Sequence, residues 1–376
     1  TTGTQNVAVG TYALDANTTA DYNVAIGYAT LTDNTTGANN TALGRLALHR
    51  NTTADNNTGL GYNALFANTT GTQNTAVGSL ALDANTTGNY NTAVGKGSLS
   101  TSTTASNNTA VGFEALKLTN TGENNVAVGR EALYTNTSAD NNTAVGFQAL
   151  FTNTTGGQSV SIGTQSLKSS TTGGENVAVG HYAGNATTTG SSNVFVGQDA
   201  GKLITTGNQN VIIGMDAADT ITTASQVIAI GCNVDPGNVD TSITIGHDIS
   251  GKGANTAFIA GTSGAYNGAN SSSWSTTSDR RIKKNIVNND SGLDKLKQIQ
   301  VRNFEYKTQD EIKTDNPELT DVVKSAAVNQ QGVQLGVIAQ EIEGVLPEVV
   351  ETQSTGVKTV NPDNITWYLV NAIKEL

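Results

Sequence analysis

The chain has 376 residues, a net charge of −11, 14% charged residues and 5% aromatic residues. This composition argues against an ordinary globular core, and the negative charge disfavours nucleic acid as a partner, because phosphate binding depends on clustered Lys and Arg. No apolar run approaches the length of a membrane span, so we expect no membrane insertion, and the single cysteine, Cys232, excludes an intrachain disulfide.

A seventeen-residue repeat occupies most of the chain. A glycine closes a short apolar run at each step from Gly10 through Gly27 and Gly44 to Gly231, and the step then shortens to fifteen residues at Gly246 and Gly261. The chain begins inside this repeat and ends inside a helical pattern, so we expect it to be a fragment of a longer protein.

Each repeat predicts one turn of a parallel β-solenoid. A typical unit runs from Asn74 to Tyr90: a short β-type run ending at Gly78, a second apolar pair at Ala81 and Leu82, and a turn-rich Asn-Thr-Thr-Gly segment. β-Branched residues suit a pleated surface, and Gly and Asn suit turns. We therefore expect two short strands per turn, turns stacked roughly 4.8 Å apart, and Asn ladders along the axis.

A helical repeat is the weaker alternative, because Gly, Thr and Asn are poor helix formers and no period of three to four persists. The recurring Asn-[Thr/Val]-Ala-[Val/Ile]-Gly followed by Ala-Leu resembles the head repeats of trimeric autotransporter adhesins, and similar repeats occur in phage tail fibres. The resemblance covers residues 1–261 and implies a trimeric β-roll. The adhesin units are usually shorter than seventeen residues.

Other recurrent residues have plain interpretations. Asn-x-Thr triplets such as Asn17-Thr18-Thr19 match a glycosylation pattern, but a repeated turn explains them better. The isolated His49, His181 and His247 are expected at the surface rather than as ligands. We expect neither a metal site nor a cofactor.

The residue composition and pattern change after Gly261. Residues 262–277 read as a linker, and residues 278–376 resemble a small α/β domain. A helix is expected over Leu293–Ile299 after an N-cap at Ser291, strands over Val301–Tyr306 and Val333–Ile338, and a helical turn over Ala339–Val345. A final helix, capped by Asp363 or Asn364, would place Ile365, Leu369, Ile373 and Leu376 on one face.

Three blocks of this last segment resemble the peptidase S74 family, the intramolecular chaperone domains of phage endosialidases and tail fibres. The first follows the family's Ser-Asp-x-Arg-x-Lys-x-x-Ile opening, filled by Ser278, Asp279, Arg281, Lys283 and Ile286. The second block includes Gln340 and Glu341 and continues through Leu346-Pro347-Glu348, and the third is the closing Ala372–Leu376.

This resemblance implies self-cleavage between Thr277 and Ser278, with Ser278 as the nucleophile and Lys283 as the general base. The domain would trimerise, guide folding of the shaft, cut itself off and leave. The residues themselves add that all three histidines and the cysteine precede Ser278, so a Ser-His-Asp arrangement inside the domain is impossible. On local residues alone, the Arg280–Lys284 cluster reads better as a solvated basic face.

The sequence therefore predicts a mostly β protein: a trimeric solenoid shaft over 1–261, a linker over 262–277 and a self-cleaving chaperone domain over 278–376. The leading function is a phage tail-fibre or tail-spike segment in the virion. Its expected partners are its own copies, other virion tail proteins and a host cell-surface receptor, with a glycan among the candidates. The alternative is a bacterial surface trimeric adhesin. An endosialidase-type enzyme would need a further catalytic domain.

Overall fold

The computed structural model describes residues 2–251, 253–259, 265–267, 284–308, 311–312, 315, 332–352 and 357–376, with only the backbone at 265–267 and at 363. The chain divides into two compact units, Thr1–Ala254 and Asn255–Leu376. Each unit is described by itself.

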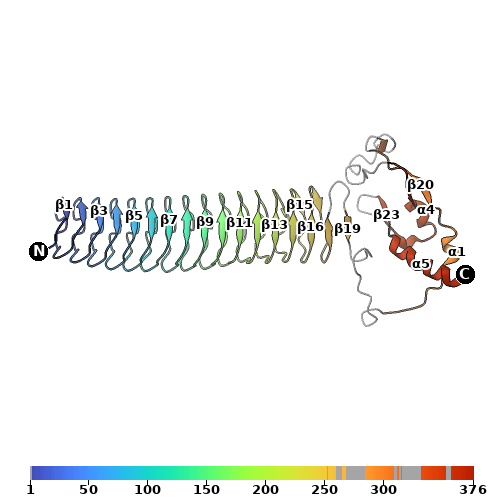
Figure 1. The fold of residues 1–376 in the computed structure, drawn as a ribbon, viewed down its shortest axis with the longest axis horizontal. Coiled ribbons are helices and arrows are strands. Elements are labelled where there is room, and N and C mark those ends of the chain that lie inside the picture. Colours follow the sequence, from blue (N-terminus) through green and yellow to red (C-terminus); the bar gives the residue numbers. More distant parts are fainter. Residues whose placement is uncertain are drawn as a thin grey trace. The chain divides into compact units, whose positions relative to one another are not determined.

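The first unit is a parallel β-solenoid whose three-residue strands stack along the shaft (Figure 1). Each strand pairs with the next in parallel at an offset of seventeen residues, as in Val7↔Val24 and Thr92↔Thr109. The predicted β-solenoid is confirmed. The strands are β1 Val7–Val9, β2 Val24–Ile26, β3 Thr41–Leu43, β4 Thr58–Leu60, β5 Thr75–Val77, β6 Thr92–Val94, β7 Thr109–Val111, β8 Val126–Val128, β9 Thr143–Val145, β10 Val160–Ile162, β11 Val177–Val179, β12 Val194–Val196, β13 Val211–Ile213, β14 Ile228–Ile230 and β16 Ile243–Ile245.

The glycine after each strand is required by the stacking. Gly112 has a φ of +138°, a conformation that L side chains rarely adopt. A Cβ there would lie 2.4 Å from the carbonyl oxygen of Gly129 in the next turn. The glycines Gly10 to Gly231, here called the glycine column, therefore allow the backbone of successive turns to come into contact.

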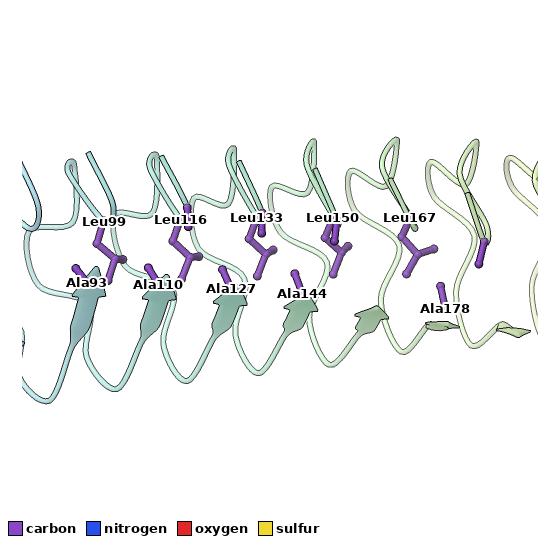
Figure 2. Close-up of a cluster of buried hydrophobic side chains, with 14 of the residues drawn as sticks. Ala93, Leu99, Ala110, Leu116, Ala127, Leu133, Ala144, Leu150, Leu167 and Ala178 are labelled. Atoms are coloured by element: carbon purple, nitrogen blue, oxygen red, sulfur yellow. The ribbon is translucent and has the colours of Figure 1, made fainter. Parts of the chain in front are cut away.

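Alanine and leucine fill the interior. The middle residue of each strand points inward, as Ala110 and Ala127 do, and meets a leucine such as Leu116 from the opposite side of the turn (Figure 2). These side chains are fully buried. A small strand residue against a large turn residue makes a narrow core that repeats every turn.

Two columns of buried asparagines connect the turns. The backbone N–H of Asn125, just before β8, donates to Oδ1 of Asn108 at 2.9 Å, and its Nδ2 donates to the Ala139 carbonyl at 2.9 Å. In the other column, Nδ2 of Asn68 donates to Oδ1 of Asn51 at 2.9 Å. The predicted Asn ladders are confirmed, and they satisfy backbone groups that the short strands leave over.

The expected second strand in each turn is wrong for the seventeen-residue turns. The Ala-Leu pair lies in a turn, with the leucines in the left-handed region, at φ +50° for both Leu116 and Leu133. That conformation breaks a strand, although the Leu116 N–H still donates to Ala132 of the next turn at 3.0 Å. A second strand appears only where the step shortens to fifteen: β15 (Val234–Asp235) pairs in parallel with β17 (Ile249–Ser250).

Near the C-terminal end of the shaft, large and small core residues exchange places. Gly184 and Gly201 occupy places that are leucines in the earlier turns, and Phe195 replaces the inward alanine between them. An added Cβ would approach the Phe195 ring to 2.5 Å at Gly184 and 2.6 Å at Gly201. One buried ring thus fills the volume that two leucines leave.

The second unit contains short elements. They are β18 Ala257–Ile259 paired antiparallel with β19 Ala265–Asn267, α1 Leu293–Leu296, β20 Arg302–Phe304 paired antiparallel with β21 Gln334–Gly336, α4 Ala339–Glu343, the 3-10 turn η3 Pro347–Val349, β22 Val350–Thr352 paired antiparallel with β23 Lys358–Val360, and α5 Pro362–Glu375.

The expected elements of this unit exist, but two predicted helix caps are wrong. Helix α1 is capped by Gly292 rather than Ser291, without a side-chain hydrogen bond. A Cβ on Gly292 would lie 2.3 Å from the backbone nitrogen of Ala372, so close packing on α5 decides this position. Helix α5 begins at Pro362, which suits a first helical turn, so Asp363 and Asn364 lie inside the helix.

The size exchange at Phe195 gives the first prediction. Phe195→Ala should destabilise the shaft by about 3–5 kcal/mol, because the cavity cannot collapse between two glycines. Adding Gly184→Leu restores the usual alanine–leucine pair and should recover part of the loss. Thermal unfolding followed by circular dichroism measures both. A double variant no more stable than Phe195→Ala would contradict this account of the core.

Candidate functional site

The predicted cleavage residues Thr277, Ser278, Asp279, Arg281 and Lys283 lie outside the described residues. The described residues begin again at Lys284, and the segment from Lys284 to Asp290 has neither helix nor strand. In this segment the side chains of Ile286 and Val287 are exposed. The cleavage site and its base therefore remain predictions.

The second predicted block lies on α4, where Gln340 and Glu341 behave differently. Glu341 accepts two hydrogen bonds from Arg302 of β20, at 3.2 Å from Nε and 3.0 Å from the terminal nitrogen. This bidentate pair connects α4 to β20, the strand that pairs antiparallel with β21. Gln340 is exposed and makes no side-chain hydrogen bond among the described residues. Glu341 therefore contacts β20 through Arg302, a partner 39 residues away that sequence reasoning missed.

The same block supplies the small core of this unit. Ile342 of α4, Leu346 just before η3 and Val349 of η3 are buried together. Around them pack Ile299, Val337, Val345, Val350, Val360, Ile365 and Tyr368. The motif that resembles the chaperone family is thus largely a packing motif, since its apolar residues form the core and its polar ones the rim.

Helix α5 is fixed to the segment 289–293 by hydrogen bonds. The Leu293 N–H donates to Oε2 of Glu375 at 2.8 Å, and Nδ2 of Asn371 donates to the Asn289 carbonyl at 2.6 Å. The predicted apolar face of α5 is only partly used, because Ile365 packs in the core while Ile373 is 70% exposed. Trp367, which lies outside the predicted face, is 67% exposed. Such exposed large apolar side chains indicate a contact surface.

A Tyr–Glu pair at the rim carries shifted pKa values. The hydroxyl of Tyr368 on α5 donates to Glu348 of η3. This bond lowers the pKa of the Glu348 carboxyl and raises the pKa of Tyr368. The pair connects the final helix to the Leu-Pro-Glu turn of the second block.

The outer face of the shaft sheet carries a row of aliphatic side chains. While the middle residue of each strand points inward, its two neighbours point outward, and the last is always Val, Ile or Leu. These last residues form what we call the aliphatic stripe: Val9, Ile26, Leu43, Leu60, Val77, Val94, Val111, Val128, Val145, Ile162, Val179, Val196, Ile213, Ile230 and Ile245. All are half-buried or exposed. The stripe is a continuous apolar surface along the shaft.

Aromatic and cationic side chains alternate beside the glycine column. Arg45 lies between Tyr28 and Tyr62, with its guanidinium carbon 5.9 and 5.6 Å from the ring centroids. Arg130 lies likewise between Phe113 and Phe147 at 5.6 and 5.8 Å. These cation–π stacks run along the axis and connect side chains of successive turns, so they contribute to the stacking of the turns.

Burial supports the interpretations given above for the Asn-x-Thr triplets and for the three histidines. The asparagines of Asn-x-Thr triplets such as Asn34, Asn68 and Asn85 are fully buried, so the folded shaft cannot present them for glycosylation. His181 and His247 are exposed. His49 is half-buried and stacks on Phe66 with ring centroids 5.4 Å apart.

Comparison with protein families identifies the end of the chain. Residues 278–351 match the model of the peptidase S74 family, described as chaperone of endosialidase. This C-terminal segment is therefore similar to the chaperone-of-endosialidase family. The family of this domain is associated with autoproteolytic cleavage, and the domain together with a β-solenoid shaft fits a protein of the phage tail-fibre or tail-spike type. No curated protein matches the chain.

No helix in the described part of the chain is long and apolar enough to cross a membrane.

The Tyr368–Glu348 pair gives a pH prediction. A lowered pKa in the folded state means that Glu348 contributes stability above its unfolded pKa, and that this contribution is lost as the pH falls through the folded pKa. Tyr368→Phe should return the Glu348 pKa towards its ordinary range and remove this acid-side contribution. Carboxyl carbon chemical shifts followed by NMR during an acid titration measure the change. An unchanged Glu348 pKa in the variant would refute the assigned cause.

Proposed function

We propose that this chain is a homotrimeric tail-fibre or tail-spike segment of a phage, used for host attachment and matured by its own C-terminal chaperone domain. The observation that carries the proposal is where the family match begins. It starts at Ser278, after the seventeen-residue turns have ended and at the serine predicted to be cut. A shaft that is to be separated from its chaperone needs its cut between the two.

The proposed cleavage uses Ser278 and Lys283. Lys283 takes the proton from the Ser278 hydroxyl, and the oxygen attacks the Thr277 carbonyl. The peptide C–N bond breaks, leaving an ester between Thr277 and the Ser278 side chain and a free amine on Ser278. Water then opens the ester to give a Thr277 carboxylate. Attack by a serine of a neighbouring subunit is the other form of this reaction.

The reaction is single-turnover and follows assembly, because only a folded site aligns the hydroxyl with the carbonyl. The chaperone domain then leaves the shaft. Glu341 contributes to the cleavage only indirectly, since its pair with Arg302 holds α4 against β20. Asp279 and Arg281 complete the junction motif.

The homotrimer is supported by two apolar surfaces. On the shaft, the aliphatic stripe runs the length of the sheet face. In the chaperone domain, Trp367 and Ile373 of α5 are exposed. We propose that three copies turn these surfaces towards a common three-fold axis. The rest of the shaft surface then remains for a host receptor, a glycan among the candidates, and for other virion tail proteins.

The cleavage prediction concerns chain length. Ser278→Ala should leave a full-length chain while the shaft still folds, because no hydroxyl remains to attack Thr277. Lys283→Ala should also block the cut. Intact-mass spectrometry of the purified protein reads the result, with fragments 1–277 and 278–376 expected from the unaltered chain.

Two neighbouring residues give matched controls. Ser275→Ala and Lys284→Ala change the same side-chain types close by, and both should still be cut. Efficient cleavage of Ser278→Ala would end the serine assignment, whereas normal processing of Lys283→Ala alone would move the base to another group.

The trimer prediction concerns the aliphatic stripe. Val128→Asp should dissociate the shaft trimer, because three carboxylates would be buried without partners at one level of the axis. Leu118→Asp is the control, since Leu118 is equally exposed on one chain, 37% against 36%, but lies off the stripe. Sedimentation velocity measures the oligomeric state. Equal behaviour of the two variants would argue against the stripe as the contact.

A further inference from the structure

A second column of residues runs along the shaft at the edge where the strands begin. It is formed by the eleventh residue after each member of the glycine column, and we call it the cap column. Its members are Asp21, Ala38, Asp55, Thr72, Asn89, Ser106, Glu123, Asp140, Gly157, Gly174, Ser191, Asn208 and Ser225. Gly157, for example, lies three residues before β10, so the cap column is separate from the aliphatic stripe, which lies at the strand ends.

Side chains of the cap column accept a backbone N–H from the turn before. Oδ1 of Asn89 accepts the Thr72 N–H at 2.7 Å. Oγ of Ser191 accepts the Gly174 N–H at 3.2 Å. The acceptor in each case is an oxygen of a short polar side chain, and it satisfies a donor that the stacked turns leave over.

Two successive turns lack this cap. Gly157 and Gly174 have no side chain, and the N–H groups of Asp140 and Gly157 have no acceptor among the residues that the structure describes. The missing side chains face these groups. An added Cβ would lie 3.8 Å from the Asp140 nitrogen at Gly157, and 3.3 Å from the Gly157 nitrogen at Gly174.

Elsewhere in the column a missing cap is isolated. Within residues 2–251, the N–H groups of Asp21, Asp55 and Ser106 also lack an acceptor, but the turns on both sides of each are capped. Asp140 and Gly157 therefore differ from these three, because they place two uncapped N–H groups in adjacent turns, roughly 4.8 Å apart.

The two glycines leave a hollow of about 460 Å³, which we call the glycine hollow. Among the residues that line it, those with polar side chains include Asp140, Asn141, Thr155, Gln158, Glu175 and Ser191. Most of these are exposed, so the hollow opens to solvent. No Lys, Arg or aromatic residue lines it.

The two carboxylates of the hollow each have an oxygen to spare. Oδ1 of Asp140 accepts the Glu123 N–H at 2.7 Å, and Oε2 of Glu175 accepts the Ser192 hydroxyl at 2.9 Å. In the described part of the chain, the second oxygen of neither carboxylate has a hydrogen-bond partner. The hollow thus offers both donors and acceptors.

This combination selects a neutral, hydroxyl-rich ligand. Two N–H donors disfavour a metal cation, and no group of three His, Cys, Asp or Glu among the described residues could hold one. Two carboxylates without a cation in the lining disfavour an anion. A sugar hydroxyl accepts from an N–H and donates to a carboxylate, so it satisfies both kinds of group.

We propose that the glycine hollow binds a neutral saccharide unit, whose oxygens accept the Asp140 and Gly157 N–H groups and whose hydroxyls donate to Asp140 and Glu175. This rests on the proposed host attachment and gives the receptor its chemical class. The hollow is formed within one chain, so a trimer carries three copies of it. Weak binding at each copy would add up on a surface that repeats the same sugar.

The test uses the full chain labelled with ¹⁵N at glycine, so that the Gly157 N–H itself is observed by NMR. The probes are the methyl glycosides of glucose, galactose, mannose and N-acetylglucosamine. At least one should shift the Gly157 signal with a dissociation constant of roughly 1–10 mM, as expected of a small ligand held by a few hydrogen bonds in water. The methyl glycoside of glucuronic acid, an anion, should bind at least roughly tenfold more weakly than that of glucose.

Gly157→Asn supplies the side chain that Asn89 provides elsewhere in the cap column. It should fill the hollow, cap the Asp140 N–H and weaken glycoside binding at least roughly tenfold. Saturation-transfer NMR on the glycoside measures this, because the variant lacks the Gly157 signal. The added Cβ would lie 3.0 Å from the Asp140 carbonyl oxygen, so a small shift accommodates it.

Two further variants keep the test independent of that substitution. Ser106→Asn introduces the same residue in the same column three turns away, and it should bind like the unaltered chain. Glu175→Gln keeps the size of the side chain and removes the charge, so it should weaken binding roughly threefold or more, because hydrogen bonds to a carboxylate are the stronger ones.

The outcomes separate this inference from the proposed function. Binding that survives Gly157→Asn, or no binding of any glycoside up to roughly 100 mM, would refute the saccharide site. A Gly157 shift caused by CaCl₂ alone, without any by a glycoside, would make the hollow a cation site instead. None of these results bears on trimer assembly or cleavage, which sedimentation and intact mass report. A monomeric or uncut chain would contradict the proposed function and leave the hollow in place.

Discussion

Every turn of the shaft depends on the hydrogen bonds that it makes to the turns on either side. Seventeen residues bury too little apolar surface to fold alone, so stability is shared between neighbours. This requirement explains the glycine column, because a side chain at Gly112 would hold the next turn away. It also explains the buried asparagines. Their amides reach the backbone groups that three-residue strands leave unpaired, and an unpaired buried polar group is costly.

The alternation that builds the interior also builds the outside. In each strand the middle side chain, most often alanine, turns inward and its two neighbours turn outward, and the last of these neighbours is an aliphatic residue in every turn. A chain with such a face needs a cover. The same register that stacks the turns therefore aligns the aliphatic stripe along the shaft.

The C-terminal unit uses a different physical strategy. Its core is a few aliphatic residues around Ile342 and Leu346, and polar pairs at the rim connect elements far apart in the chain. Arg302 with Glu341 holds α4 to β20, and Tyr368 with Glu348 holds α5 to the turn before β22. A small core with exposed apolar residues on its last helix is suited to a domain that is completed by its own copies.

The sequence by itself determined the period, the solenoid and the family of the C-terminal domain. These follow from spacing and local chemistry: glycine every seventeen residues, an inward alanine, recurring asparagines, and the three motif blocks. The sequence did not determine that the Ala-Leu pair is a turn, since both residue types suit strands or helices and only contact with the next turn forces Leu116 into the left-handed region. It also gave no sign that Glu341 faces Arg302 or that Gly292 caps α1. Such contacts join residues far apart in the chain, and only tertiary packing decides which of many equivalent charges and small residues meet.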